Sequence, residues 1–579
     1  MRFAKNFSSF LHSVVFSVAV LITYLFLSLN AVAAPALPDT GNLPKIETQP
    51  APPVINSPEI ENKKGSNYPA AMPENSDIRV TVGHFKFIGN KNVSEANLTA
   101  LLSSHLGQSL GIKELNQLTA LVTHYYRNLG YMLAEAYLPE QDITQNTLEI
   151  AVVEGYLGEL KVETKDKLDE NFLSQMAMRD LASNDAIKEA NLVRNITLIN
   201  SLPGVKAISE LSPGTEVGYS DVSIDLQALP LFNGYVGINT YGNRYTGRET
   251  IFAGLFLNNL AGRGDRLGLN LKDANHERQR SAQIGYILPI HASGTMLNLN
   301  AGYSDYRLGG EFSVLKASGD SWYASTYVDQ PMLRSRKGNV TTRFGVSHKD
   351  VSDDVSAFSL ENHRGVNAVE LGFFGDWRDS NWSGANQLGV NLKFGEVDFK
   401  NRLAQSLDDT GAKTDGNFVK YSLFGSRIQP INATNNLILR AEYQGADNNL
   451  DSSEKLAIGG INRWREFGEL PTSADRGLIV GAEFRRTMLP VNEVASFLQA
   501  LKDIEVSPYA FVDYGKGIIN HSALTDDNHV SSVHYGAGID MQITKSWMLD
   551  LTVSHQRSKI EGVNSESETR AWGQIRTEF

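Results

Sequence analysis

The chain has 579 residues and a formal net charge of −12, so it is too long for one ordinary domain and too acidic for a general nucleic-acid partner. It contains no cysteine, which excludes disulfides, thiolate metal sites and cysteine nucleophiles. Its 49 glycines and its many tyrosines and phenylalanines are typical of a protein with many turns and aromatic-bearing strands.

The N-terminal segment, residues 1–33, has the organisation of an export signal. Arg2 and Lys5 give a positive start, residues 10–29 are mostly apolar, and residues 31–33 supply an A-x-A cleavage site. The apolar run is longer than in most signals, so an uncleaved membrane anchor is the competing interpretation. Small residues and prolines follow directly, which favours cleavage. The sequence has no second run of this kind, so any further membrane span is expected to be a barrel.

Residues 34–77 form a linker. They hold nine of the nineteen prolines, with Asn, Ser and Glu between them. Such a composition predicts an extended, solvated linker with little fixed structure.

Two small domains follow, at residues 78–155 and 156–229. In each, the patterns predict the order strand, helix, helix, strand, strand, and this recurrence indicates tandem α+β domains. Each is expected to have an antiparallel sheet with helices on one side. In the first domain, Ser94 is a plausible N-cap and Gly130 a helix stop. One face of the second helix is expected to carry Ile112, Leu115, Leu118, Val122, Tyr125 and Leu129.

From residue 230 to residue 579 the predicted helices stop and short alternating segments follow, separated by Gly, Asn, Asp and Ser turns. At roughly 22 residues per strand with its connection, they give about 16 strands. A soluble barrel or propeller is the alternative, but a propeller needs a blade repeat of about 40 residues, and none is visible. The sequence therefore predicts a transmembrane antiparallel β-barrel of about 16 strands.

The last strand, "ETRAWGQIRTEF", separates a less polar face from a charged face. Such a strand suits lipid outside and a polar lumen inside. The face expected toward lipid carries Ala571, Gly573, Ile575, Thr577 and Phe579, and the lumenal face carries Trp572, Gln574, Arg576 and Glu578.

Several stretches resemble the outer-membrane transporters of two-partner secretion, the secretion and activation proteins for haemolysins and filamentous hemagglutinin. Residues 136–155 and 202–222 are similar to parts of the family's two POTRA domains. "AIGGINRWREF" resembles its sixth-loop motif, and "FVDYG" resembles a partner motif on a barrel strand. The resemblance covers residues 79–579. It is specific because the sixth-loop motif and then the wall motif follow two POTRA-like domains in the sequence.

This resemblance implies that a loop around residues 459–477 folds into the lumen, and that its arginine, Arg465, meets Asp513 on the barrel wall. Glu466 stands where the family usually has a small residue. Residues 34–77 are too rich in proline to suggest a plug helix. The loop motif falls on Gly459, Gly460, Trp464, Arg465 and Phe467, and the wall motif falls on Phe511, Asp513 and Gly515.

The implied function is a pore in the outer membrane of a Gram-negative cell, contacting lipid and lipopolysaccharide, with its POTRA domains in the periplasm. The partner is expected to be a large, β-helical secreted exoprotein, and the pore to be monomeric. A POTRA domain could capture the exoprotein by pairing an extended segment of it, as an added strand, with the edge of its sheet. The candidate capture residues are Ile112, Leu115, Val122 and Tyr137, although core packing is the competing interpretation for most of them.

The sequence offers no catalytic constellation. "NHERQR" lacks the second histidine of a zincin helix, and neither a G-x-S-x-G elbow nor a P-loop is present. We therefore expect no enzyme activity, cofactor, metal or nucleic-acid partner. Two alternatives to the secretion pore stay open: an insertase that assembles other barrels, and a passive porin or ligand receptor with periplasmic domains.

Overall fold

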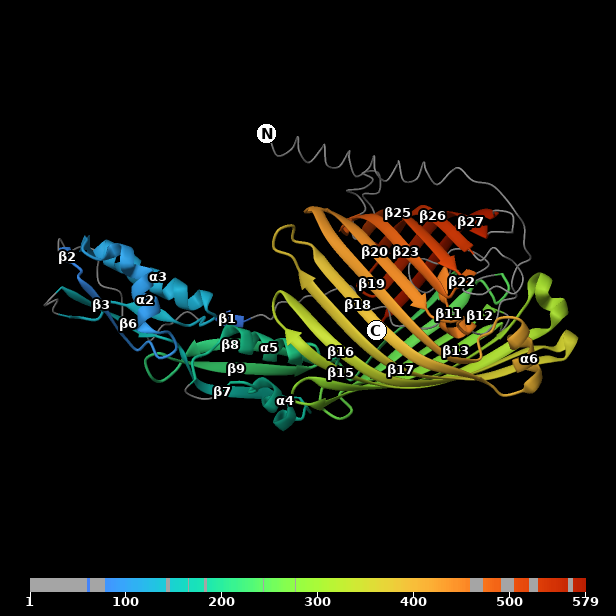
Figure 1. Ribbon diagram of the computed structural model, residues 1–579, viewed down its shortest axis with the longest axis horizontal. Coiled ribbons are helices and arrows are strands. Elements are labelled where there is room, and N and C mark those ends of the chain that lie inside the picture. Colours follow the sequence, from blue (N-terminus) through green and yellow to red (C-terminus); the bar gives the residue numbers. More distant parts are fainter. Residues whose placement is uncertain are drawn as a thin grey trace, which may run out of the picture.

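A computed structural model describes residues 60–62, 79–141, 146–164, 166–181, 185–242, 244–275, 278–458, 472–490, 504–519, 529–560 and 566–579. Two small α+β domains lie in a row beside one end of a large β-barrel, the second domain next to the barrel and the first farther out (Figure 1). The expected signal segment lies outside the described residues. No helix among the described residues is long and apolar enough to cross a membrane.

The first domain is built on a three-stranded sheet, in the order β3–β6–β5, against which α2 and α3 pack. β3 and β6 run parallel, which corrects the expected antiparallel sheet, because the long helical connection returns the chain in its original direction. The elements are β2 (Arg79–Thr81), β3 (His84–Ile88), α2 (Glu95–Leu102), β4 (Ser109–Gly111), α3 (Ile112–Asn128), β5 (Glu135–Tyr137) and β6 (Thr147–Val153), with β2 paired to β4.

Helix α2 begins as expected, with the amide of Asn97 donating to the Ser94 hydroxyl. Helix α3 is followed by Gly130, whose φ of 93° is the left-handed conformation that ends a helix. The expected apolar stripe is right at its start but wrong at its end. Tyr126 is fully buried, while Leu129 keeps 49 % of its surface exposed, because the helical stripe reaches position 126 one turn after Val122.

The second domain has the sheet order β1–β8–β9–β7. Strand β1 comes from the segment expected to be an unstructured linker, and it pairs in parallel with β8. β1 covers this edge of β8 because a strand edge carries amides and carbonyls that an extended segment can satisfy. β7 and β9 are also parallel, contrary to expectation. The elements are β1 (Ile60–Asn62), β7 (Tyr156–Thr164), α4 (Glu170–Ala177), α5 (Glu189–Asn200), β8 (Val205–Pro213) and β9 (Tyr219–Ala228).

The barrel is antiparallel and closes where β10 pairs with β28. Among the described residues it has sixteen long strands, as expected; the two-residue β24 pairs with the start of β25. The strands are β10 (Phe232–Asn239), β11 (Thr250–Asn258), β12 (Arg266–Ala274), β13 (Gln279–His291), β14 (Thr295–Arg307), β15 (Ala317–Arg334), β16 (Gly338–Val355), β17 (Leu360–Arg378), β18 (Ala385–Phe399), β19 (Gly416–Asn432), β20 (Asn435–Ala446), β23 (Arg476–Arg486), β24 (Leu489–Pro490), β25 (Glu505–Ile518), β26 (His529–Gln542), β27 (Trp547–Ile560) and β28 (Glu566–Glu578). Between the strands lie α6 (Arg402–Thr410) and the 3-10 turns η4 (Gly310–Leu315), η5 (Ser356–Phe358) and η6 (Ser452–Glu454), while η2 (Ser103–His105) follows α2.

An apolar band surrounds the barrel wall. On β17 the outward residues Val369, Leu371 and Phe373 keep 39–47 % of their surface exposed. The terminal strand obeys the same rule: Phe579 is 58 % exposed, while Trp572 is buried inside. Lipid is the environment that such an outer band requires.

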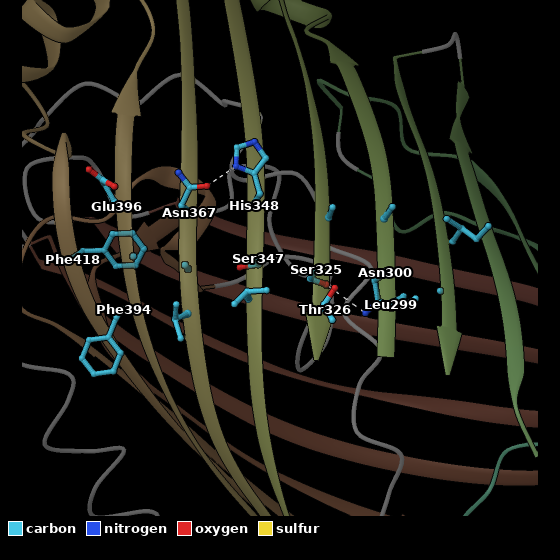
Figure 2. Close-up of a pocket in the computed structure, with 18 of the residues that line it drawn as sticks. Leu299, Asn300, Ser325, Thr326, Ser347, His348, Asn367, Phe394, Glu396 and Phe418 are labelled. Carbon is cyan, nitrogen blue, oxygen red and sulfur yellow. Dashed lines mark hydrogen bonds between the residues drawn. The ribbon is translucent and has the colours of Figure 1, made fainter. Parts of the chain in front are cut away.

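A row of polar side chains bounds this band. His348, Asn367, Glu396 and Asn417 stand directly opposite one another on β16 to β19. Figure 2 shows the first three side by side, with Phe394 below the row. His348 and Asn367 are hydrogen-bonded at 2.7 Å. A hollow of about 1090 Å³ lies along these strands. Its lining residues belong to both faces of the barrel wall, so the hollow is a feature of the barrel surface and not an enclosed ligand site.

The second small domain is fixed to turns at one end of the barrel. Arg263 in the β11–β12 turn pairs with Asp169 at 3.0 Å and lies over the ring of Phe172. Arg336 in the β15–β16 turn pairs with Glu189 of α5 at 2.7 Å. These contacts hold the domain at one end of the barrel lumen.

Candidate functional site

The segment between β20 and β23 folds back onto the barrel wall through a short hairpin. Its strands are β21 (Leu456–Ile458) and β22 (Thr472–Ala474), which pair antiparallel. Leu456, Ile458 and Ala474 are buried together with Ile479 of β23 and Val530 of β26. The loop motif that extends from this hairpin, Gly459, Gly460, Trp464, Arg465 and Phe467, lies outside the described residues.

The wall motif faces this hairpin. Asp513 and Phe511 are buried on the lumenal face of β25, whereas Val512 and Tyr514 point the other way. Strand alternation therefore gives the expected orientation. Phe511 packs in a cluster with Tyr509 and Trp572.

The motif glycine Gly515 and its neighbour Gly517 leave room for the hairpin. A Cβ atom at Gly515 would lie 2.7 Å from Cγ2 of Ile458, and one at Gly517 would lie 2.2 Å from Cδ1 of Ile458 and 2.4 Å from Cβ of Ala474. Real Cβ contacts are longer, so only glycine lets the hairpin lie this close to β25. Gly515, the third residue of the wall motif, therefore has a steric role in addition to the ion pair expected of Asp513.

A second set of contacts lies on the neighbouring wall. Glu454 of η6, which is 2 % exposed, meets the ammonium groups of Lys349, Lys393 and Lys420 at 3.0, 3.1 and 2.5 Å. The lysines stand on β16, β18 and β19. Lys393 also pairs with Glu370 of β17 at 2.8 Å. We call Lys349, Lys393 and Lys420 the lysine cradle.

Beside the cradle, Arg364 of β17 is 3 % exposed and joins loop to wall. Its guanidinium pairs with Asp353 of β16 at 2.8 Å and with Asp451 of the loop. It also donates to the Ser452 hydroxyl at 3.1 Å. Fork-shaped donation to two carboxylates fixes both partners in orientation.

Sequence reasoning missed the cradle and Arg364. The available signal was a basic residue at a lumenal position of several neighbouring strands, together with the acidic segment "DSSEK" before the loop motif. Because the strands are far apart in sequence, their register was needed to bring the lysines together.

The capture candidates of the first domain divide into two groups. Ile112, Leu115 and Val122 are at most 9 % exposed and pack in its interior, so they are core residues and do not offer a surface. Helical spacing could not separate these roles, because a core stripe and a groove stripe share one period. Tyr137 is half-buried on β5, at the edge of the sheet.

A buried carboxylate joins the two small domains. Glu154 is fully buried and accepts from the amide and side chain of Asn92, at 2.7 and 2.6 Å, and from the hydroxyls of Tyr126 and Tyr156, both at 3.0 Å. Burial, with Glu154 nearby, raises the pKa of Tyr126 well above its ordinary value and that of Tyr156 to about 12. Both hydroxyls therefore stay protonated donors at neutral pH.

The fold and the lumenal loop define a class of protein: an outer-membrane barrel with periplasmic POTRA domains. Residues 218–541 match the family described as haemolysin secretion/activation protein ShlB/FhaC/HecB, and residues 80–155 match the POTRA domain of the ShlB type. The chain belongs to this family of transporters, which are not enzymes. It is an outer-membrane transporter that secretes a partner exoprotein.

Similar proteins span almost the whole chain. The heme/hemopexin transporter protein HuxB of Haemophilus influenzae (strain 86-028NP) is 27 % identical over 93 % of this chain and 94 % of its own length. The outer membrane transporter CdiB of Dickeya dadantii is 24 % identical over 81 % of each chain. The solved structure of CdiB from Escherichia coli covers 89 % of this chain and 93 % of its own, with a TM-score of 0.69 and 19 % identity.

Proposed function

We propose that the protein captures an unfolded exoprotein in the periplasm with its POTRA domains and passes it outward through the barrel once the lumenal loop moves. The single observation that carries this proposal is the hairpin of β21 and β22, whose Leu456, Ile458 and Ala474 are buried against the barrel wall near the wall motif. A loop held inside a barrel by local contacts is an obstacle that local changes can displace. Arg465 is proposed as the partner of Asp513.

The first domain is the better capture surface of the two. In the second domain, β1 already covers the outer edge of β8. In the first, β5 with Tyr137 forms one end of the sheet within the described residues. An extended exoprotein segment could add there as a further strand, with main-chain hydrogen bonds supplying the affinity.

The partner is proposed to be a large, β-helical exoprotein, and the pore to work as a monomer in contact with lipid and lipopolysaccharide. Relatives that span the chain are named for heme/hemopexin transport, so a heme- or hemopexin-binding exoprotein is the first partner to test. Folding of the exoprotein outside the cell would supply direction, since the sequence has no nucleotide-binding motif.

A secretion assay in a deletion strain tests the proposal. The exoprotein should disappear from the medium while other barrels assemble normally, and the wild-type chain should restore it. Arg465→Ala and Asp513→Ala should each impair secretion with the barrel still folded, and Arg463→Ala, which changes the other arginine of "INRWREF", should do less. General failure of barrel assembly would instead support an insertase, and equal secretion by the three variants would remove the proposed loop anchor.

A further inference from the structure

The lysine cradle is part of the barrel wall and does not depend on the loop for its position. Lys349, Lys393 and Lys420 stand on three separate strands, and their side chains are between 11 and 21 % exposed. The register of β16 to β19 fixes their spacing. The wall alone therefore presents three converging ammonium groups toward the lumen.

The carboxylate that fills this cradle belongs to a removable segment. Glu454 sits in η6, a three-residue turn of the loop, and is held there by main-chain contacts as well. Its carbonyl accepts from the ammonium group of Lys420 at 3.1 Å and from the side-chain amide of Gln444 at 3.2 Å. If the loop moves away, Glu454 leaves with it while the lysines stay.

Such a movement changes the charge balance of the recess. On the wall, Glu370 keeps its ion pair with Lys393. Three ammonium groups and this carboxylate then share a partly desolvated space. Partly buried cations strongly favour a new anionic partner, because ammonium groups lose hydration there without a full set of counter-charges.

We propose that the lysine cradle is a carboxylate-binding site of the pore, filled at rest by Glu454 of the loop and filled during secretion by acidic side chains of the passing polypeptide. The ligand is a carboxylate on an extended chain, because the cradle lines the lumen through which that chain travels. The inference rests on the proposed transport function and adds a chemical preference to it.

Planar-bilayer recordings with the purified full-length chain test the resting state. Glu454→Gln removes the charge but keeps the shape, and we expect it to increase the open probability of the pore several-fold, because the loop loses its charge-assisted bonds to the cradle. Glu454→Asp keeps the charge and should stay near the wild type. Asp329→Asn is the matched control, since Asp329 pairs with Arg343 at 2.6 Å between two wall strands.

A peptide of about 20 residues tests the ligand chemistry. One version carries glutamate at every second position and the other carries glutamine. With Glu454→Gln in the bilayer, the glutamate peptide should block the current at about a tenth of the concentration needed for the glutamine peptide, a ratio that one or two charge-assisted bonds supply. Adding Lys393→Gln and Lys420→Gln to this variant should abolish the difference.

Two outcomes overturn the proposal: unchanged opening in Glu454→Gln, or equal block by the two peptides. Heat-modifiable migration in gels verifies that each variant still forms a barrel. No exoprotein takes part in these recordings, so their failure leaves the transport function standing. Conversely, normal peptide block in a chain that secretes nothing would count against the transport function alone.

Discussion

At the scale of single residues, Glu154 shows how one carboxylate holds two domains together. Its oxygens accept from Asn92, Tyr126 and Tyr156 in a site closed to water. Glu154→Gln replaces one acceptor by a donor that faces other donors, and we expect it to lower the free energy of unfolding of the POTRA region by about 1–3 kcal/mol. Urea unfolding of the full chain, followed by proteolysis of residues 79–228, measures this. An unchanged midpoint would contradict it.

Tyr126 and Tyr156 predict that the free energy of unfolding of the POTRA region depends on pH in the alkaline range. Their pKa values are raised in the folded state, so the unfolded chain loses protons first. The stability they contribute is complete below pH 10 and falls as the pH rises toward 12. Tyr156→Phe should weaken this fall, which urea midpoints at pH 8, 10 and 11 would measure. An identical slope in the variant would refute the assignment.

Gly517 makes a steric prediction. Alanine at this position would place its methyl group 2.2 Å from Cδ1 of Ile458 and 2.4 Å from Cβ of Ala474, and since the Ala474 methyl cannot rotate away, the hairpin must shift away from β25. We expect Gly517→Ala to increase protease cleavage of the loop, and Ile458→Ala together with Ala474→Gly in the same chain to restore protection by removing both contacts. Gly425→Ala is the control, because a Cβ atom there would meet only atoms at 3.6 Å or more. Equal protection in all variants would mean that the hairpin does not lie this close.

At the scale of elements, helix α4 begins at a residue that also docks the domain on the barrel. The amide of Phe172 donates to Asp169, and Arg263 of the barrel turn pairs with the same carboxylate; together they lower the pKa of Asp169. A depressed pKa means that this stability is present above the unfolded value, near 4, and is lost as the pH falls through the folded value.

We therefore expect the amides of α4 to exchange hydrogen faster near pH 3 than the normal pH dependence of exchange explains. Asp169→Asn keeps a capping oxygen but loses the ion pair with Arg263, so it should show this loosening already at pH 7. Hydrogen exchange with mass spectrometry measures both effects. Exchange in α4 that follows only the intrinsic pH dependence would contradict the coupling.

Strand patterns predicted the barrel well because lumen and lipid impose a period of two on every strand. Phe511 and Asp513 on β25 and Trp572 and Phe579 at the C-terminus lie on the faces expected. The small domains were less predictable. Parallel pairing of β3 with β6, and the addition of β1 to β8, depend on contacts between distant segments that local alternation does not encode.

At the scale of the whole molecule, the segment from η6 to β22 joins two regions of the barrel wall. Its acidic end contacts β16 to β19, and its hairpin packs on β23 to β26. The motif resemblance could point to the second contact, since Gly515 of the wall motif belongs to it. The first contact required the three-dimensional register, because Lys349, Lys393 and Lys420 come from separate strands.

Arg364 tests whether this connection stabilises the whole barrel. Arg364→Gln would remove the guanidinium that binds Asp451 of the loop and Asp353 of the wall, leaving two carboxylates in a buried site. Loss of one partner of such a buried network costs about 3–5 kcal/mol, so the barrel should unfold in urea at a clearly lower concentration. Lys400→Gln is the control, because Lys400 pairs with Asp398 at 2.5 Å with the two side chains 43 and 58 % exposed, where pairs contribute at most about 1 kcal/mol. If both variants unfold at the same urea concentration, the loop lies in the lumen without stabilising the barrel. If only Arg364→Gln unfolds at a lower concentration, displacement of the loop during secretion must leave the pore less stable than at rest.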